Sequence, residues 1–114
     1  MKIYHNPRCR KSREAVQYLS DEGKKFEIIE YLKDNLSREA IQIILKKLNM
    51  TALELVRKNE KIWKENYKDK NLSEKELIEL LHKEPKLIER PIIESENFAV
   101  IGRPKENIDL LFNN

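Results

Sequence analysis

The sequence of 114 residues predicts a single α/β domain with a helical insertion in its middle. Three observations support this fold class. A strand, a helix and a second strand fit into residues 2–32, helical spacing of apolar residues fills the middle, and two apolar runs precede a last helix. A chain of this length is large enough for one hydrophobic core and too short for two, so we expect residues 1–114 to form one domain.

The first strand–helix–strand unit begins with the segment KIYH, residues 2–5, which is typical of a short strand. The loop NPR follows, and an amphipathic helix then runs from Cys9 to Gly23, which can adopt the conformation that ends a helix. Residues 24–32 predict a second strand. This order predicts a βαβ unit with parallel strands and a right-handed crossover.

The helical insertion is expected at about residues 36–86. Three helix starts carry hydroxyl residues that can accept a hydrogen bond from a free backbone N–H, and two of them have a glutamate three residues later. These signals are Ser37, Thr51 with Glu54, and Ser73 with Glu76. Thr51 precedes a helix predicted over residues 52–59, Trp63 is the expected packing anchor of a short helix, and Pro85 ends the helical stretch.

The C-terminal part returns to short apolar runs. Residues 90–95 and 98–102 predict a hairpin around Glu96 and Asn97, because asparagine tolerates the left-handed conformation of tight hairpin turns. Residues 103–112 then predict one closing helix with Pro104 in its first turn.

The composition argues against several classes of function. The net charge is +3, and basic and acidic residues alternate along the chain, so we expect no nucleic-acid partner. No apolar run is typical of a membrane span or a signal peptide, and a single cysteine fits a reducing compartment, which predicts a cytoplasmic protein. Neither histidine has a second ligand at metal-binding spacing, so we expect no metal.

The single cysteine, Cys9, is the strongest candidate for chemistry. It stands at the start of the first helix, where unpaired backbone N–H groups favour a thiolate and can also bind an oxyanion. Four basic residues are its neighbours in the sequence: Arg8, Arg10, Lys11 and Arg13. A lone cysteine is more often a small buried hydrophobic residue, but this polar and basic segment is a poor place for one. We therefore predict a pKa of the Cys9 thiol below the ~8.5 of a free thiol.

The two histidines are weaker candidates. His5, at the end of the first strand, either tunes the thiol by hydrogen bonding or simply packs in the interior, and both interpretations stay open. His82 lies in a helical segment with no companion ligand, which favours a helix-surface residue.

Three arginines later in the chain complete a specific pattern. Arg57 lies in LVRKN, Arg90 in ERPII and Arg103 in GRPKE. Together with IYHNPRCRKSR, they resemble in order and spacing the glutaredoxin-coupled arsenate reductases of the ArsC family, whose motif is His-Asn-Pro-x-Cys-x-x-Ser-Arg with a later Arg-Pro-Ile. The resemblance runs from Lys2 to Leu111. It implies a thioredoxin-like fold, with a four-stranded mixed sheet and a helical insertion, and it implies an oxidoreductase that reduces arsenate.

The resemblance also implies a role for each residue of a candidate site. The site comprises Cys9, then Arg57, Arg90 and Arg103, and the supporting residues His5, Ser12 and Pro91. Cys9 matches the nucleophile that attacks arsenate, and the three arginines match the residues that bind the oxyanion. His5 and Ser12 match positions beside the thiol, where the Ser12 hydroxyl is expected to donate a hydrogen bond to the thiolate. Pro91 matches a proline that is cis in this fold.

The reductant follows from the single thiol. Ser12 stands where a redox Cys-x-x-Cys pair has its second sulfur, so an outside thiol must resolve an oxidised Cys9. The expected partners are glutathione and then glutaredoxin, with no bound cofactor. Arginine suits an oxyanion because its planar guanidinium stays charged and offers several hydrogen-bond donors. Any one of the three arginines alone would be interpreted as the partner of a surface ion pair.

Two other functions stay open. Spx-type regulators share this fold and bind the alpha subunit of RNA polymerase, with a Cys-x-x-Cys switch that Ser12 removes here. A general glutathione-dependent thiol oxidoreductase needs Cys9 but does not need three arginines. The three arginines favour the arsenate reductase over both alternatives. The sequence departs from the family pattern at Arg10 and Lys11, where well-known arsenate-reducing members carry small uncharged residues.

Overall fold

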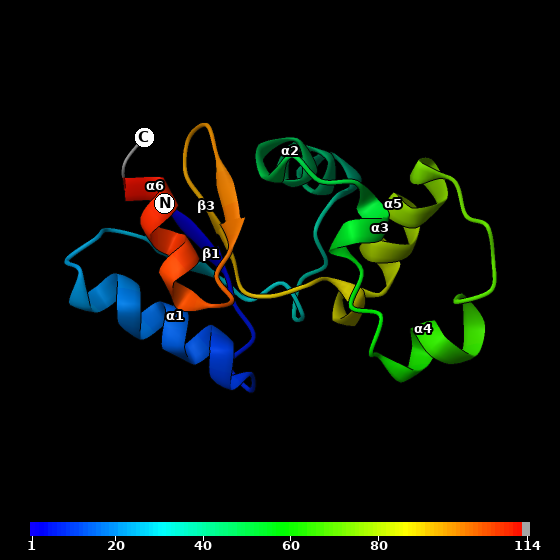
Figure 1. The fold of residues 1–114 in the computed structure, drawn as a ribbon, viewed down its shortest axis with the longest axis horizontal. Coiled ribbons are helices and arrows are strands. Elements are labelled where there is room, and N and C mark those ends of the chain that lie inside the picture. Colours follow the sequence, from blue (N-terminus) through cyan, green and yellow to red (C-terminus); the bar gives the residue numbers. More distant parts are fainter. Residues whose placement is uncertain (113–114) are drawn as a thin grey trace. The chain divides into compact units, whose positions relative to one another are not determined.

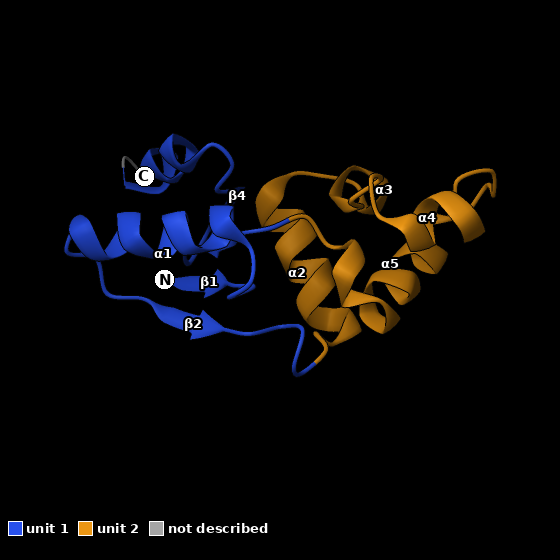
Figure 2. Ribbon diagram, turned by 90° about the horizontal axis from the view of Figure 1, so that it is seen from below, with its two compact units in different colours: residues 1–34, 90–114 blue, residues 35–89 orange. Residues whose placement is uncertain are grey.

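The computed structural model describes residues 1–112 and divides into two compact units. One unit combines Met1–Asp34 with Arg90–Asn114, and the other is Asn35–Glu89 (Figure 2). The predicted helical insertion, about residues 36–86, falls inside the second unit. The prediction of one domain stays a prediction, and each unit is described by itself below.

A four-stranded mixed sheet forms the centre of the first unit (Figure 1). Its strands are β1 (Lys2–Tyr4), β2 (Glu27–Ile29), β3 (Ile92–Glu94) and β4 (Ala99–Ile101), in the order β2-β1-β3-β4. The β1–β2 pair is parallel, and the β1–β3 and β3–β4 pairs are antiparallel. The predicted parallel βαβ unit and the predicted C-terminal hairpin are therefore both confirmed.

The turn of the β3–β4 hairpin differs from the prediction. Among residues 1–112, Asn49 is the one non-glycine residue with a positive φ, so the expected left-handed Asn97 is wrong. Ser95 closes this turn instead: its N–H and its hydroxyl both donate to the Phe98 carbonyl, at 2.8 and 2.9 Å, and its Oγ accepts from the Phe98 N–H at 3.2 Å. These side-chain bonds replace the contribution expected from a left-handed asparagine.

Helix α1 (Arg10–Asp21) lies within the predicted range of Cys9 to Gly23 and is one residue shorter at its start and two at its end. Cys9 is its N-cap, and Gly23, at φ 68°, follows its C-cap residue. The Gly23 N–H donates to Ser20 O at 3.0 Å and the Lys24 N–H to Leu19 O at 3.1 Å, which is the hydrogen-bond pattern of a Schellman motif. Glycine is needed at this position because L-residues with a side chain rarely adopt a positive φ.

The core of the first unit lies between the sheet and α1. Ile3 of β1 and Ile93 of β3 are directly opposite each other and fully buried. They pack with Leu19 of α1 and with Ile108 and Leu111 near the C-terminus. This cluster packs α1, whose N-cap is Cys9, against the sheet.

Gly102 is a tight point in this core, and Gly102→Ala is expected to lower the free energy of unfolding by about 1–3 kcal/mol. A Cβ on Gly102 would come within 2.7 Å of Ile93 Cδ1 and 3.3 Å of Pro91 Cγ, so a buried side chain must shift. Urea denaturation measures the loss. Gly23→Ala is the control without a clash, because nothing lies within 4 Å of its added Cβ and only the positive φ costs about 1 kcal/mol. A Gly102→Ala protein as stable as the parent would contradict this packing.

The chain after β4 forms two short helices, where one helix was predicted. The 3₁₀-helix η2 (Lys105–Ile108) comes first, with Pro104 as its N-cap, and helix α6 (Asp109–Phe112) follows. The Asn107 side chain donates to Ile101 O at 3.1 Å and ties this region to the end of β4. A tighter 3₁₀ turn is common at the start of a helix.

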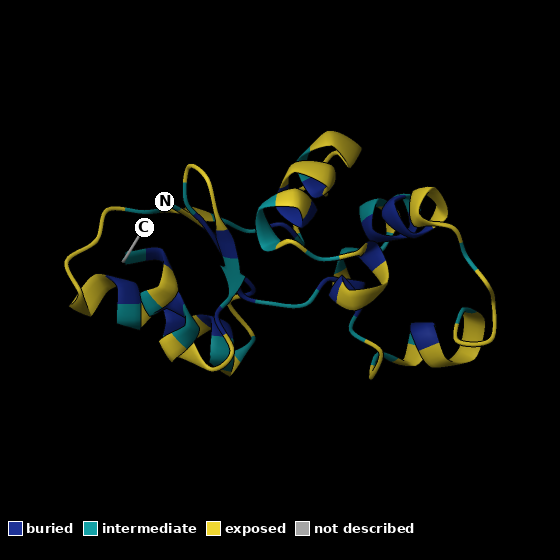
Figure 3. Cartoon of the chain, turned by 45° about the horizontal axis from the view of Figure 1, so that its top comes forward, coloured by how far each residue is buried: buried dark blue, intermediate teal, exposed yellow. Residues whose placement is uncertain are grey.

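The second unit is helical, with α2 (Arg38–Leu48), α3 (Ala52–Leu55), α4 (Lys61–Asn66), α5 (Glu74–Lys83) and the 3₁₀-helix η1 (Pro85–Leu87). The predicted cap of Ser37 and the capping boxes of Thr51 and Ser73 are confirmed. Trp63 is buried, as expected of a packing anchor. Figure 3 shows that α2 and α5 each have one buried face and one exposed face. No helix within residues 1–112 is long and apolar enough to span a bilayer.

Helix α3 is shorter than predicted. The expected helix over residues 52–59 ends at Leu55, because Val56 forms an antiparallel bridge with Ile88. The Arg57 N–H donates to Leu87 O at 2.7 Å and the Glu89 N–H donates to Leu55 O at 2.9 Å. Backbone pairing with a distant segment therefore ends this helix.

Candidate active site

Cys9 lies in a loop whose backbone is held by local hydrogen bonds. Its N–H donates to Asn6 O at 3.0 Å, and its carbonyl accepts the Arg13 N–H at 3.0 Å as the first bond of α1. The buried Asn6 side chain accepts the Arg8 N–H at 3.0 Å. Cys9 itself is half-buried. The thiol is therefore fixed in position at the helix start and still reachable from solvent.

The pKa of the Cys9 thiol is lowered from 9.0 to about 7. Partial burial of the thiol acts in the opposite direction and raises the pKa. Hydrogen bonds from the Ser12 backbone N–H, the Arg90 side chain and the Lys11 backbone N–H, together with the charge of Arg90, outweigh it. The predicted lowering of this pKa is confirmed, and it increases the share of thiolate near pH 7.

This ionisation can be measured by alkylation. Because the thiolate is the nucleophile, the rate of iodoacetamide alkylation of Cys9 should rise with pH through a midpoint of about 7. No second cysteine contributes to the signal. A midpoint at or above the ~8.5 of a free thiol would contradict the assignment.

The cations nearest to Cys9 in the sequence are not the source of this shift. Arg10 and Lys11 pair with Glu14, at 3.5 and 3.6 Å, and Arg13 donates to Pro7 O at 2.9 Å. The cation that lowers the pKa is Arg90, which is 81 positions away in the sequence. Proximity in the sequence pointed to the basic residues next to Cys9, but the sheet brings Arg90, which is distant in sequence, to the thiol.

Ser12 acts through a different atom than expected. Its backbone N–H is hydrogen-bonded to the thiol, while its fully buried hydroxyl oxygen accepts from the Asn6 N–H at 3.4 Å. Ser12 therefore supports both the thiolate and the loop that carries it.

Two of the three predicted arginines lie at the thiol. Arg103 Nη2 is 3.4 Å from Cys9 Sγ and donates to it, and the Arg90 side chain is also hydrogen-bonded to the sulfur. Arg90 lies two residues before β3 and Arg103 two residues after β4, so the hairpin places both beside the start of α1. The Arg90–Pro91 bond is cis, as the resemblance implied, and the Arg103–Pro104 bond is cis without having been predicted.

His5 is buried at the end of β1, with 7% of its surface exposed. Its N–H donates to Ile29 O at 2.9 Å, and its Nδ1 has no hydrogen-bond partner among residues 1–112. Burial lowers the pKa of the imidazole, the Glu30 carboxylate raises it and the Arg13 cation lowers it further. The net effect favours the neutral ring at pH 7, and a role of His5 toward the thiol stays a prediction.

Arg57 belongs to the second unit and is held there by two carboxylates. Its Nη1 lies 3.0 Å from Glu60 Oε1 and its Nε lies 3.4 Å from Glu89 Oε1, and 19% of its side chain is exposed. Its backbone N–H is bonded to Leu87 O. That Arg57 joins the thiol at an oxyanion site stays a prediction.

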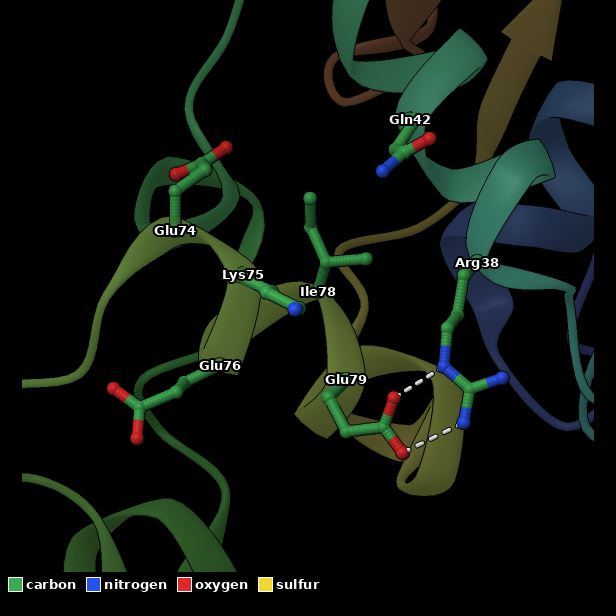
Figure 4. Close-up of a pocket in the computed structure, with 7 residues that line it drawn as sticks. All are labelled: Arg38, Gln42, Glu74, Lys75, Glu76, Ile78 and Glu79. Carbon is green, nitrogen blue, oxygen red and sulfur yellow. Dashed lines mark hydrogen bonds and ion pairs between the residues drawn. The ribbon is translucent and has the colours of Figure 1, made fainter.

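The second unit has a pocket of its own, about 710 Å³ in volume, that does not include any predicted site residue. Its lining residues are Arg38, Gln42, Glu74, Lys75, Glu76, Ile78 and Glu79 (Figure 4). Three of the lining carboxylates have structural partners: Glu79 pairs with Arg38, Glu74 accepts the Ala52 N–H, and Glu76 completes the Ser73 capping box. The lining contains neither a thiol nor a histidine, and Cys9 remains the candidate site. No group of residues within 1–112 could hold a metal ion.

A mixed four-stranded sheet with a half-buried cysteine at the first helix start is typical of the thioredoxin-like fold, and comparison with known proteins supports this fold class. The model of the ArsC family matches residues 4–111, so the chain belongs to the ArsC family. The uncharacterized protein YfgD of Escherichia coli (strain K12) is 44% identical over 95% of this chain and 92% of its own length.

Relatives named as arsenate reductases are similar over nearly the whole chain. The arsenate reductase of Neisseria meningitidis serogroup A is 36% identical, covering 96% of this chain and 95% of the relative. The solved structure of an arsenate reductase from Vibrio cholerae has a TM-score of 0.90 and 36% identity, covering 96% of this chain and 97% of the other. The thioredoxin-like fold with a mixed four-stranded sheet is therefore confirmed.

Proposed function

We propose that this protein is an arsenate reductase, an oxidoreductase in which the Cys9 thiolate attacks the oxyanion. The observation that carries the proposal is the thiol of pKa about 7 with Arg103 Nη2 at 3.4 Å and the Arg90 side chain on the same sulfur. A thiolate next to two guanidinium groups is suited to receive a tetrahedral anion, because the cations offset the charge that develops on its oxygens.

Arg57 is proposed as the third oxyanion ligand. Its pairs with Glu60 and Glu89 keep the guanidinium charge balanced while no anion is bound. Three uncompensated guanidinium groups that bind one anion would repel each other, and the carboxylate partners of Arg57 would offset part of its charge.

The proposed reaction balances as follows. Cys9 Sγ forms a bond to As(V) while an As–O bond breaks, and the oxygen leaves as water after protonation. Reduction to As(III) takes two electrons, which come from two thiols that become one disulfide. Glutathione supplies one of these thiols and glutaredoxin the other, so their mixed disulfide is the oxidised product. Hydrolysis of the S–As bond then releases arsenite and returns the Cys9 thiol.

The external reductants are proposed because the sequence contains no second cysteine. No bound cofactor is needed, since the electrons pass through sulfur atoms. A free, low-pKa thiol of this kind works in a reducing compartment, and we therefore place the protein in the cytoplasm.

A coupled assay tests the proposal. The purified protein is given arsenate, glutathione and glutaredoxin, and arsenite is measured directly. Arsenite formation that depends on both reductants supports the full proposal. If arsenite forms with thioredoxin in place of glutathione and glutaredoxin, the protein is still an arsenate reductase. The proposed electron source, glutathione with glutaredoxin, would then be wrong.

The same proteins distinguish a general thiol oxidoreductase. Reduction of a glutathione mixed disulfide needs Cys9 alone, so it should survive Arg57→Ala, Arg90→Ala and Arg103→Ala. Disulfide exchange without any arsenite would favour that function, and capture of the RNA polymerase alpha subunit without arsenite would favour a regulator.

A further inference from the structure

Cationic side chains gather around the thiol, and three of them do not contact the sulfur through their charged groups. We call Arg8, Arg10 and Lys11 the basic patch: Arg8 precedes Cys9 in the loop, and the other two form the first turn of α1. The side chain of Arg10 is 76% exposed and that of Lys11 is 41% exposed. Arg103 adds a fourth cation from the segment after β4. The positive charge therefore comes from two segments that are distant in sequence.

Little negative charge offsets the basic patch. Glu14 is the carboxylate that pairs with it, and it is shared between Arg10 and Lys11 at the long distances of 3.5 and 3.6 Å. Such exposed and shared pairs bind weakly because water screens them. The surface around Cys9 therefore stays positive and available to an anionic partner.

The charges of α1 run against the helix dipole. The first turn of α1 has no acidic residue and its last turn has no basic residue. The other two long helices have the favourable order: α2 has Glu39 in its first turn and lysines in its last, and α5 has glutamates first and His82 with Lys83 last. Cations at a helix N-terminus destabilise the helix, and a locally unfavourable choice of this kind is typical of functional sites.

The basic patch is distinct from the oxyanion site. The Arg90 and Arg103 side chains contact the sulfur, whereas those of Arg10 and Lys11 point to Glu14. A small oxyanion on Cys9 would be bound by the first pair of arginines. A separate partner is needed to account for the cations on the outer side of the loop and helix.

We propose that the basic patch is a docking surface for the protein thiol that reduces this enzyme, and that it binds carboxylates surrounding the reactive cysteine of that partner. This inference rests on the proposed function. An acidic protein surface fits better than a small thiol, because several cations on both sides of Cys9 in the chain can engage several carboxylates together. Charge complementarity of this kind speeds the encounter and sets its orientation, which brings the partner's sulfur to the exposed side of Cys9.

The test measures binding of reduced glutaredoxin by isothermal titration calorimetry. Arg8→Gln with Arg10→Gln is expected to raise the dissociation constant about tenfold in low salt, which corresponds to ~1.4 kcal/mol. Lys24→Gln with Lys25→Gln removes the same charge after the other end of α1 and should leave the constant unchanged. At about 0.5 M salt the parent protein should bind as weakly as the patch variant, because the screening length shortens to a few ångströms.

Kinetics separate docking from chemistry. In the coupled assay the patch variant should have a raised KM for glutaredoxin, with the KM for glutathione and the kcat at saturating glutaredoxin unchanged. Its alkylation midpoint should stay at about 7, because neither side chain contributes to the Cys9 pKa.

Equal binding of glutaredoxin by the patch variant and the lysine control would overturn the docking surface. A change confined to the KM for glutathione would also overturn it, in favour of a small-thiol site. If the parent protein forms no arsenite, the proposed function fails, while the calorimetric comparison still decides whether the patch binds an acidic thiol protein.

Discussion

Cys9→Ser is expected to lower arsenate reduction by at least about a thousandfold, a loss of ~4 kcal/mol in transition-state stabilisation. The serine hydroxyl stays protonated at pH 7, so the amides of Lys11 and Ser12 and the Arg90 guanidinium have no anion to stabilise at this atom. The measurement is arsenite formation in the coupled assay with glutathione and glutaredoxin.

The fold should not change in this variant. Cys9 is half-buried at the N-cap position, and serine is a favoured N-cap residue, so the thermal midpoint should stay equal or rise slightly. Substantial arsenite from a folded Cys9→Ser protein would mean that another group carries the chemistry.

Arg90→Gln is expected to lower kcat/KM for arsenate by about a hundredfold at pH 9, because a charged donor to the oxyanion is lost. The loss at pH 7 should be several times larger. Arg90 holds the Cys9 pKa down at about 7, so its removal raises the pKa toward the ~8.5 of a free thiol and leaves less thiolate at pH 7. At pH 9 the thiolate predominates in both proteins, and this part of the effect disappears. The pH profile of kcat/KM, read beside the alkylation profile, measures both parts.

Arg103→Gln is the matched control for the pH dependence. Arg103 donates to the same sulfur at 3.4 Å but is not among the causes of the lowered Cys9 pKa. Its replacement should weaken arsenate turnover by a similar factor at both pH values, with the alkylation midpoint near 7. An Arg90→Gln profile parallel to that of Arg103→Gln would contradict the role of Arg90 in ionising the thiol.

The parts of the fold that could be predicted depend on local chemistry. Ser37, Thr51 and Ser73 cap helices through bonds to residues three positions away, and Gly23 ends α1 because its own φ is positive. Such signals are complete within a few residues, so they can be recognised in the sequence. The short apolar runs likewise located the four strands.

One of the predictions that failed involves a partner that is distant in sequence, and the other two involve nearby residues. Helix α3 ends at Leu55 because Val56 pairs with Ile88, and nothing within residues 52–59 signals that bridge. The hairpin turn depends on Ser95 and Phe98, which are three positions apart, whereas the prediction rested on Asn97. The closing helix divides into η2 and α6, with Asn107 bonded back to Ile101 of β4.

In the candidate site, too, some features follow from the local sequence and others depend on the tertiary structure. The sequence by itself determined that one thiol stands at a helix start and that the backbone amides there can stabilise a thiolate. Only the tertiary structure decided which cations reach the sulfur: the hairpin brings Arg90 and Arg103 to Cys9, while the adjacent Arg10 and Lys11 turn to Glu14. The physical reason is that a thiol's pKa depends on charges near it in space, and neighbours in space are set by sheet pairing more than by position in the chain.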